Sequence, residues 1–543
     1  MWLLLTELAV TFAVLVTASV HYLYMLQLES YQVDGYLRHL KRNPMEWRGW
    51  PLMLGVSCAV SQWVLPVIFS ISTGDQADAK KYTHLFLLAV FVCYAAKKIL
   101  DSYRTPRKKP PKFTPRMRRL TLCHIGLLAA FTALYALIFA HDITDKGLRL
   151  MYLSSFILLA VLPWLVALSA KVMEPYERRI NRGFFRQARQ KLDASKDLIR
   201  VGITGSYGKT GTKFALTTIL SEKYRVLTST SSINTPMGLS KLINTELNPS
   251  HQVFVAEMGA RHVGDIEELT ELVGPTMGLI TSVGPQHLET FGNIETVAET
   301  KYELIKALPK DGVALFASDG AWTDKLYART KCEKYLTGVG EGKYDLRAEN
   351  VEVGSFGSRF TLKSASGESI RVETGLLGRH NISNLVLCCC AAARLGLTMD
   401  EIASGLKKIK PVEHRLQLIS GPVNVIDDSF NSNPSGAAEA LNVLSGFSGK
   451  RIIITPGMVE MGPEEDRFNY EFGCKMASCA DIAILVGPKH SAPIREGLLK
   501  NGFNEKCIHT AKNLDEATQI QRKLTAVGDT VLFENDLPDN YNE

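Results

Sequence analysis

The 543-residue sequence has no CxxC pair among its ten cysteines, no internal repeat and no low-complexity tract. Cys388, Cys389 and Cys390 are consecutive in an apolar stretch that reads as a helix. Three adjacent side chains point in three directions around a helix, so they cannot converge on one metal ion. We therefore expect small buried thiols in a reducing compartment.

A strong charge imbalance is also absent, because the formal net charge is only +7. The length predicts two to four domains rather than one. Leu, Ile, Val and Phe cluster before residue 172, whereas the later residues have the composition of a soluble protein. The mean hydropathy of +0.02 therefore averages two different halves.

Apolar runs dominate the first half, at about 2–24, 50–72, 83–96, 121–140 and 150–171. Most of them approach the ~20 residues that a membrane-spanning helix needs. The third run is short and could be a tilted or re-entrant segment. No basic start and no A-x-A site precede the later runs, so we expect no cleaved signal peptide. The first half thus predicts an all-α transmembrane domain of about five helices over residues 1–175.

Lysine and arginine placement predicts the orientation of these helices. Segment 97–119 holds ten basic residues and one acidic residue, and segments 25–49 and 176–197 are also basic. The loops 73–82 and 141–149 carry two basic residues each. All three basic segments face the cytoplasm only if the N-terminus is outside and the number of crossings is odd. We therefore expect a multi-pass protein of the cell membrane whose soluble half is cytoplasmic.

Two functions are open for the basic segments. Segment 97–119 could be a nucleic-acid patch, but its apolar flanks favour topology and anionic lipid head groups, so we expect no nucleic-acid partner. Residues 176–197 read as a basic amphipathic connector that lies near the membrane surface.

The stretch "VGITGSYGKTGTKF", 201–214, combines a short β-rich run, a glycine-bearing turn and the start of a helix. Such a unit surrounds an anion with backbone N–H groups. Gly205 and Gly208 allow close approach, Lys209 can reach the outer phosphates of a nucleotide, and Thr210 offers a hydroxyl to Mg²⁺. The strict phosphate-loop pattern requires glycine where Ile203 stands, so an ordinary glycine-rich turn is the alternative.

Two later strands end in polar side chains. Glu257 follows the buried run 253–256, and His287 follows the run 277–283. Ligands gather beyond the carboxyl ends of the strands in an open parallel sheet. Glu257, His287 and Thr210 could thus converge on one cation, although a lone Glu or His after a strand is more often an ordinary loop residue.

Seven motifs in fixed order resemble those of the Mur ligases, the ATP-dependent amino-acid ligases of peptidoglycan precursor synthesis. They are "TGSYGKTGTK", "EMGARHVGDIEEL", "PQHLETFGNIETVAETK", "LLGRHNISNLVLCCCAAARLG", "EHRLQLI", "VIDDSFNSNPSGAAEAL" and "ITPGMVEMG". "EMGA" and "DDSFNSNP" are most similar to the members that add D-alanyl-D-alanine. The resemblance covers roughly residues 198–540.

The resemblance and the alternation of strands with helices agree on the fold class of the second half, which is α/β. We expect a central P-loop ATPase domain over 198–415 and a Rossmann-like C-terminal domain over 416–543. Residues 345–375 alternate polar and apolar side chains and predict an antiparallel addition to the first domain.

The resemblance implies a ligase that forms an acyl phosphate and then an amide, with ATP and Mg²⁺ as cofactors. By position, Lys209 contacts the β- and γ-phosphates, Thr210 and Glu257 bind one Mg²⁺, and His287 binds a second. Lys301 falls where many members carry a carbamylated lysine that supports that metal. An exposed helix lysine is the alternative for Lys301.

The resemblance also implies a nucleotide-binding set and a substrate-binding set. Asn381 lies beside adenine, Arg415 contacts phosphate or ribose at the domain junction, and Asp428 holds the ribose. The phosphate loop contributes Gly205, Ser206, Gly208, Lys209, Thr210 and Gly211. The substrate contacts implied are Asn234 and Thr235 for the muramoyl peptide, and Asn431 and Asn433 for the incoming amine.

The chain departs from the family before residue 198, where soluble members hold the uridine diphosphate of their substrate and this sequence has apolar runs. We therefore expect an amino acid or dipeptide and a carboxylate-bearing cell-wall precursor as partners, the latter lipid-linked or membrane-proximal. Two alternatives stay open: a poly-γ-glutamate or capsule-polymer ligase, and a membrane-anchored regulatory protein that uses its nucleotide as a switch. The oligomeric state is not predicted.

Overall fold

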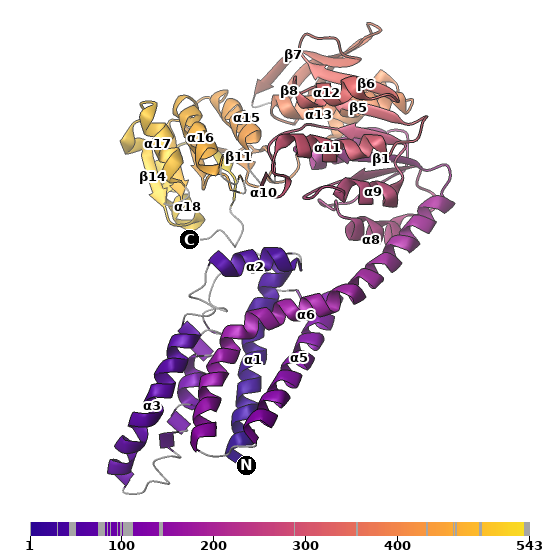
Figure 1. Ribbon diagram of the computed structural model, residues 1–543. Helices are drawn as coiled ribbons and strands as arrows, with labels where there is room; N and C mark the ends of the chain where they lie inside the picture. Colours follow the sequence, from indigo (N-terminus) through magenta and orange to yellow (C-terminus); the bar gives the residue numbers. More distant parts are fainter. Residues whose placement is uncertain are drawn as a thin grey trace. The chain divides into compact units, whose positions relative to one another are not determined.

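The computed structural model describes residues 2–29, 31–42, 50–73, 82–83, 85–86, 88–94, 96–97, 100, 112–140, 145–286, 288–354, 357–430, 433–459, 461, 464–487 and 491–536. The chain divides into two compact units, Met1–Asn181 and Arg182–Glu543 (Figure 1). His287, Asn431 and most of the segment 97–111 lie outside the described residues.

The first unit is helical where it is described. Its helices are α1 (Trp2–Leu28), α2 (Val33–Arg42), α3 (Trp50–Thr73), α5 (Pro115–Ala140) and the first part of α6 (Asp145–Ala194). Among the described residues, three stretches are long and apolar enough to cross a membrane: Leu8–Leu28, Pro115–Leu134 and Ile157–Ala194. The apolar run 50–72 forms α3 but is not one of these three, and the run 83–96 is described only in part. Five crossings therefore stay a prediction.

Polar side-chain contacts join three helices of this first unit. The imidazole of His124 on α5 lies 2.8 Å from Ser19 Oγ on α1 and 2.9 Å from Ser169 Oγ on α6. Arg119 on α5 donates two hydrogen bonds to the carboxylate of Glu177 on α6, at 2.7 and 2.8 Å. Side-chain hydrogen bonds of this kind join packed helices because they give partners to polar groups that packing removes from water.

The end of α6 belongs to the second unit. Ala188 and Leu192 are fully buried in a hydrophobic cluster of that unit. Arg189 donates to the backbone carbonyl of Glu271 at 2.8 Å, and Lys191 Nζ lies 3.1 Å from the carbonyl oxygens of Ile243 and Asn244, at the end of α8 (Pro236–Glu246). Cations at helix C-termini satisfy carbonyls that have no partner within the helix. The last turns of the basic connector are thus bound to the ligase-like half.

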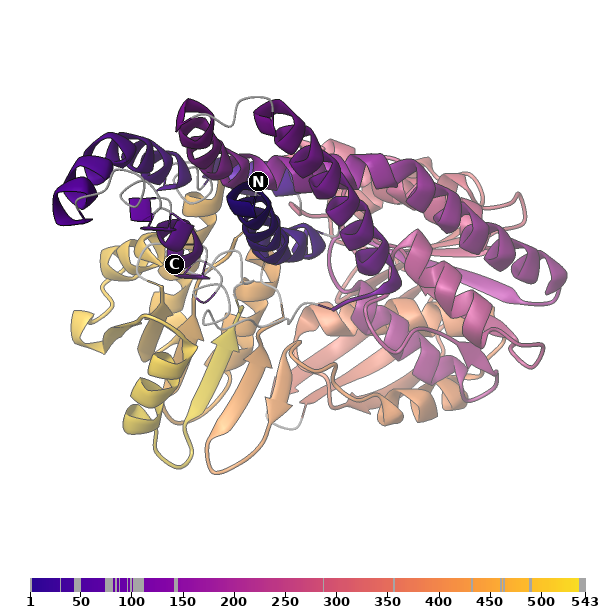
Figure 2. The ribbon, with the colours of Figure 1, turned by 90° about the horizontal axis from the view of Figure 1, so that it is seen from below.

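The second unit contains two sheets, which Figure 2 shows as arrows. The described strands of the first form a nine-stranded sheet in the order β2-β3-β1-β4-β5-β6-β7-β8-β9. Neighbouring strands are parallel from β2 to β7, and β8 and β9 are antiparallel, which confirms the antiparallel addition predicted over 345–375. The bounds are β1 (Ile199–Thr204), β2 (Val226–Leu227), β3 (Val253–Glu257), β4 (Met277–Ile280), β5 (Val313–Ala317), β6 (Glu333–Val339), β7 (Leu346–Gly354), β8 (Gly357–Ser364) and β9 (Ser369–Thr374).

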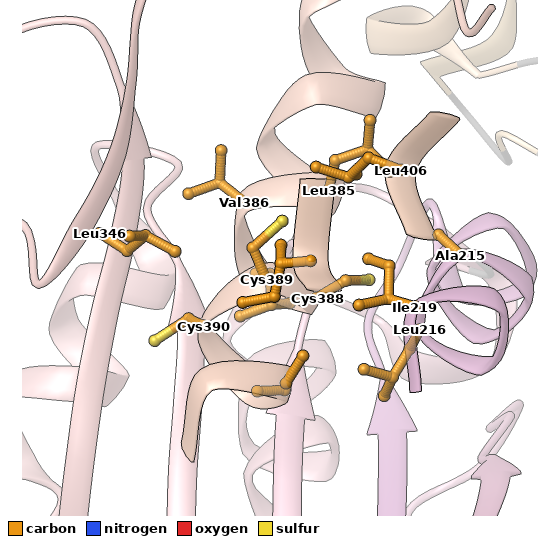
Figure 3. Packing of buried hydrophobic residues seen from close by; sticks show 14 of the residues in the cluster. Ala215, Leu216, Ile219, Leu346, Leu385, Val386, Cys388, Cys389, Cys390 and Leu406 are labelled. Carbon is orange, nitrogen blue, oxygen red and sulfur yellow. The ribbon is translucent and has the colours of Figure 1, made fainter. Parts of the chain in front are cut away.

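Two hydrophobic clusters sandwich this sheet. The first cluster includes residues of α7 (Lys209–Leu220), α13 (Arg379–Arg394) and α14 (Met399–Lys408). The second includes residues of α8 (Pro236–Glu246), α9 (Asp265–Val273), α11 (Ile294–Lys306) and α12 (Trp322–Arg329). The short helix α10 (Leu288–Phe291) is one turn long. Cys388, Cys389 and Cys390 lie inside the first cluster (Figure 3). Burial raises the pKa of the Cys389 thiol, so these residues act as small apolar side chains, as expected.

The described strands of the second sheet follow the order β10-β11-β15-β12-β13-β14, parallel except for β10. The strands are β10 (Gln417–Ile419), β11 (Asn424–Asp428), β12 (Arg451–Thr455), β13 (Ile482–Val486), β14 (Ile508–Ala511) and β15 (Thr530–Glu534), with helices α15 (Pro434–Ser445), α16 (Glu465–Cys479), α17 (Ala492–Lys500), α18 (Leu514–Leu524) and the short η3 (Glu505–Cys507).

The strand order determines where a ligand can bind. β1 lies between β3 and β4, and all three run in the same direction. Their carboxyl ends therefore bring together the glycine-bearing turn after β1, Glu257 at the end of β3, and the segment after β4. Ligands of open α/β sheets bind at such a point.

Candidate active site

The turn after β1 has room only for glycine at two positions. Gly205 has a φ of 151°, and a Cβ there would overlap the hydroxyl of Thr281. Gly208 has a φ of 80°, and its Cβ would overlap the amide of Asn384. Gly211 differs, because a Cβ there meets nothing within 4 Å. The turn thus needs Gly205 and Gly208 for its own conformation.

The N-terminus of α7 has no side-chain cap. The helix begins at Lys209, and its N-cap residue Gly208 supplies no side-chain hydrogen bond to the first turn. Lys209 Nζ instead donates to the carbonyl oxygens of Gly205 at 2.6 Å and Ser206 at 3.1 Å, inside the same turn. Burial lowers the pKa of Lys209 to about 8. Free N–H groups at a helix N-terminus beside a lysine are the groups that hold phosphates.

The turn is attached to the segment that follows β4. Ser206 Oγ donates to the carbonyl oxygen of Gly284 at 3.0 Å, and the Tyr207 hydroxyl donates to the carbonyl oxygen of Pro285 at 2.8 Å. Burial raises the pKa of Tyr207, so its hydroxyl stays a donor. These contacts fix the residues that lead to position 287.

The sequence-predicted pair Thr210 and Glu257 does converge. Thr210 Oγ1 lies 3.0 Å from both carboxylate oxygens of Glu257, and Asn234 Nδ2 donates to Glu257 Oε1 at 3.3 Å. Hydroxyl and carboxylate oxygens suit Mg²⁺, which usually keeps waters and substrate phosphates as further ligands. Within the described ranges no group of three or more His, Cys, Asp or Glu side chains could hold a metal. The hydroxyl of Thr210 and the carboxylate of Glu257 fit a magnesium ion whose further ligands are nucleotide phosphates and waters.

Lys301 is buried, so the alternative of an exposed helix lysine is wrong. It lies on α11 with 1% of its surface exposed. Burial, followed by repulsion from Lys209, lowers the pKa of Lys301 to about 7. The charged ammonium of Lys301 is therefore disfavoured relative to that of an exposed lysine.

Arg415 and Asp428 lie at the junction between the two sheets of the second unit. The guanidinium of Arg415 lies 4.3 Å from the ring centroid of Phe430, and Leu416 N–H donates to Asp428 Oδ1 at 3.0 Å. Burial raises the pKa of Asp428 to about 6. Burial also lowers the pKa of Arg415, while the negative charge of Glu257 raises the pKa of Arg415. The charge of Arg415 thus interacts with Glu257 of the Thr210–Glu257 pair and with Asp428 of the second sheet.

Three of the sequence-predicted residues have local structural contacts. Asn381 Nδ2 donates to the carbonyl oxygen of Leu377 at 2.8 Å, while Thr235 caps α8 and Asn433 caps α15. These local contacts, two of them helix caps, explain the residue types without a ligand. Their roles toward adenine, peptide and amine stay predictions.

Two side chains in this region were not found from the sequence. Asn384 lies directly against Gly208, and Lys213 Nζ lies 3.4 Å from Glu257 Oε2. A signal for Lys213 was present, since residues four apart share a helix face and Lys209 is already in the site. Asn384 gave no such signal, because its position depends on how α13 crosses α7.

The fold and this site define an α/β protein in which a glycine-bearing turn and the Thr210–Glu257 pair meet at the carboxyl ends of parallel strands. Models of two families match the chain: the Mur ligase middle domain over residues 203–392, and the Mur ligase, glutamate ligase domain, over residues 414–534.

Named relatives agree. The chain is 29% identical over 338 residues to the UDP-N-acetylmuramoyl-tripeptide–D-alanyl-D-alanine ligase of Bacillus subtilis, covering 61% of this chain and 72% of that one. It is 32% identical over 313 residues to the protein of the same name from Haemophilus influenzae, covering 56% and 67%. The fold is similar to that of the MurF ligase of Thermotoga maritima in complex with ADP, with a TM-score of 0.59, 24% identity, and coverage of 66% and 80%. The chain belongs to the Mur ligase family, whose members are ATP-dependent amide ligases.

Proposed function

We propose that this enzyme uses ATP to join D-alanyl-D-alanine to the carboxylate of a peptidoglycan precursor. The observation that carries the proposal is the Thr210–Glu257 pair beside the uncapped start of α7, where Lys209 lies. The names of the bacterial relatives supply the dipeptide and the muramoyl-peptide class of acceptor.

The chemistry follows from these groups. Mg²⁺ held by Thr210 and Glu257 would neutralise phosphate charge. An oxygen of the acceptor carboxylate bonds to the γ-phosphorus of ATP while the bond to ADP breaks, which gives an acyl phosphate. The amine nitrogen then bonds to the acyl carbon, phosphate leaves, and the nitrogen loses a proton. Lys209 and the N–H groups of α7 bind and orient the phosphates, because phosphoryl transfer depends mainly on positioning and charge neutralisation.

We also propose that Lys301 is carbamylated. Only an uncharged amine can attack CO₂, and burial lowers the pKa of Lys301 to about 7, so the reactive form is available at neutral pH. The carbamate would carry a negative charge, whereas the ammonium would repel a nearby metal ion. His287 is the second ligand that the family pattern implies for this metal.

The acceptor we propose is lipid-linked, and the enzyme is proposed to be a multi-pass protein of the cell membrane with its ligase half in the cytoplasm. The family match begins at residue 203, whereas the long apolar helices lie before residue 195. The N-terminal half thus offers a membrane attachment where soluble relatives hold a UDP-sugar.

Release of ADP that depends on the amine tests the reaction class. We expect ADP release with D-alanyl-D-alanine and an extracted lipid-linked or UDP-linked muramoyl tripeptide, and none with glutamate. Release with glutamate alone would instead support the poly-γ-glutamate alternative. Nucleotide binding without phosphate release for any amine and acceptor would support the regulatory alternative.

Depletion of the protein in cells separates the two acceptors. We expect lipid-linked tripeptide precursors to accumulate, measured by mass spectrometry of lipid and nucleotide extracts. Accumulation of the UDP-linked tripeptide alone would contradict a lipid-linked acceptor without contradicting the ligase reaction.

A further inference from the structure

Lys213 is a buried cation that the mechanism above does not use. It lies on α7, one turn after Lys209, and its side chain has no exposed surface. Its Nζ donates to Ser229 Oγ at 2.9 Å and to the carbonyl oxygen of Ser231 at 2.6 Å, and it lies 3.4 Å from Glu257 Oε2. The three N–H groups of the ammonium thus have three oxygen partners, which fixes its position.

Glu257 needs a positive partner before any ligand arrives. Its side chain is 2% exposed, and a buried carboxylate is costly unless it is paired and hydrogen-bonded. Thr210 and Asn234 donate hydrogen bonds to it but carry no charge. Lys213 is the cation within ion-pair distance among the residues the structure describes.

The same ammonium holds the segment that completes the site. Through Ser229 and Ser231 it fixes the start of the segment 229–234, in which Ser232 Oγ lies 3.5 Å from Thr210 Oγ1. Asn234, at the end of this segment, reaches Glu257. One cation therefore positions both sides of the Thr210–Glu257 pair.

We propose that Lys213 is a positioning residue that acts as the resident counter-ion of Glu257, and that it makes metal binding depend on nucleotide phosphates. A divalent ion alone would meet one carboxylate whose charge Lys213 already balances, and it would be repelled by the ammonium. The phosphates of a nucleotide supply the missing negative charge. The inference rests on the proposed nucleotide site but not on the identity of the amine or of the acceptor.

Binding of Mn²⁺, a paramagnetic substitute for Mg²⁺, tests this on the full chain in detergent micelles. Protein-bound Mn²⁺ is measured by electron paramagnetic resonance at pH 8, with and without ADP, against protein-free samples of the same composition, because ADP itself binds Mn²⁺. We expect the natural protein to bind Mn²⁺ at least about tenfold more tightly with ADP than without it. Equal affinity in the two conditions would overturn the proposal even if no variant could be made. Failure to bind Mn²⁺ in either condition would refute the nucleotide site itself.

The variant Lys213→Met removes the charge and keeps most of the side-chain volume. We expect this variant to bind Mn²⁺ in the absence of ADP at least about tenfold more tightly than the natural protein does, so that ADP increases its Mn²⁺ affinity by a smaller factor. Ser229→Ala is the matched control, because it removes one hydrogen bond of Lys213 and leaves the cation in place. A purely structural role for Lys213 predicts weaker binding in both variants and a gain in neither, and that result would overturn the proposal.

Discussion

Asp428→Asn should stabilise the free protein at neutral pH while it lowers activity. Burial raises the pKa of Asp428 from 3.8 to about 6, so the ionised carboxylate is disfavoured in the folded state. A difference of about two pKa units corresponds to about 3 kcal/mol, at 1.36 kcal/mol for each unit. Asparagine removes the charge but keeps an oxygen that can accept the Leu416 N–H.

The sign of the pH dependence follows from linkage. Because the folded pKa lies above the unfolded one, the folded state holds the proton more tightly. The penalty of ionisation is fully present above about pH 6 and disappears as the pH falls toward 4. The gain from Asp428→Asn is therefore largest at pH 8 and smaller at pH 5. Since Asp428 is half-buried, 3 kcal/mol is an upper limit.

Thermal unfolding of the full chain in detergent micelles measures this effect. We expect Asp428→Asn to raise the Tm of the ligase half by about 5 °C at pH 8 and by less at pH 5. The control is Asp427→Asn, which removes a carboxylate that bonds to His414 and Ser429 and should lower the Tm. An unchanged or lower Tm for Asp428→Asn at pH 8, or an equal gain at pH 5, would refute the reasoning.

Three further predictions concern other parts of the ligase half. Lys209→Ala should abolish turnover and leave membrane insertion unchanged, as measured by ADP release and membrane fractionation; near-normal turnover would rule out the phosphate-loop assignment. Removal of CO₂ and bicarbonate from the buffer should lower activity reversibly through Lys301, and activity independent of bicarbonate would contradict its carbamylation. Arg200→Met should lower the free energy of unfolding of the ligase half by about 2 kcal/mol in denaturant unfolding. Arg200 donates hydrogen bonds to the carbonyl oxygens of Val273, at 3.3 Å, and Leu192, at 2.7 Å. A change below about 0.5 kcal/mol would mean that these hydrogen bonds contribute little.

The Thr210–Glu257 pair was predicted from the sequence because both residues come at or after the carboxyl end of a predicted parallel strand. Polar residues that follow parallel strands meet at one edge of a sheet, and this rule needs no knowledge of which strands are neighbours. The rule could not say that β1 lies between β3 and β4, and that order is what brings Glu257 to Thr210. Burial of Lys301 was equally beyond the sequence, because α11 carries lysines on both its buried and its exposed faces.

The basic connector, residues 176–197, shows what composition alone cannot distinguish. Its basic residues were interpreted as a membrane-surface feature, yet Arg189 and Lys191 bond to backbone carbonyls of the ligase half. Composition cannot distinguish an arginine that faces lipid head groups from one that caps a helix. Only the apolar spacing of Ala188 and Leu192, four residues apart, gave a signal of packing.

Three titratable groups of the site share one property, which links its stability to its function. Burial lowers the pKa of Lys209 to about 8 and of Lys301 to about 7, and it raises the pKa of Asp428 to about 6. In each case the charged form is the disfavoured one in the free protein. Phosphates and a metal ion would restore partners for these charges, so the free site stores part of the energy that binding releases. We therefore expect MgADP to raise the Tm of the natural protein by more than it raises that of Asp428→Asn, at the same concentration of free MgADP. An equal rise in both would show that the strain at Asp428 is not relieved by the nucleotide.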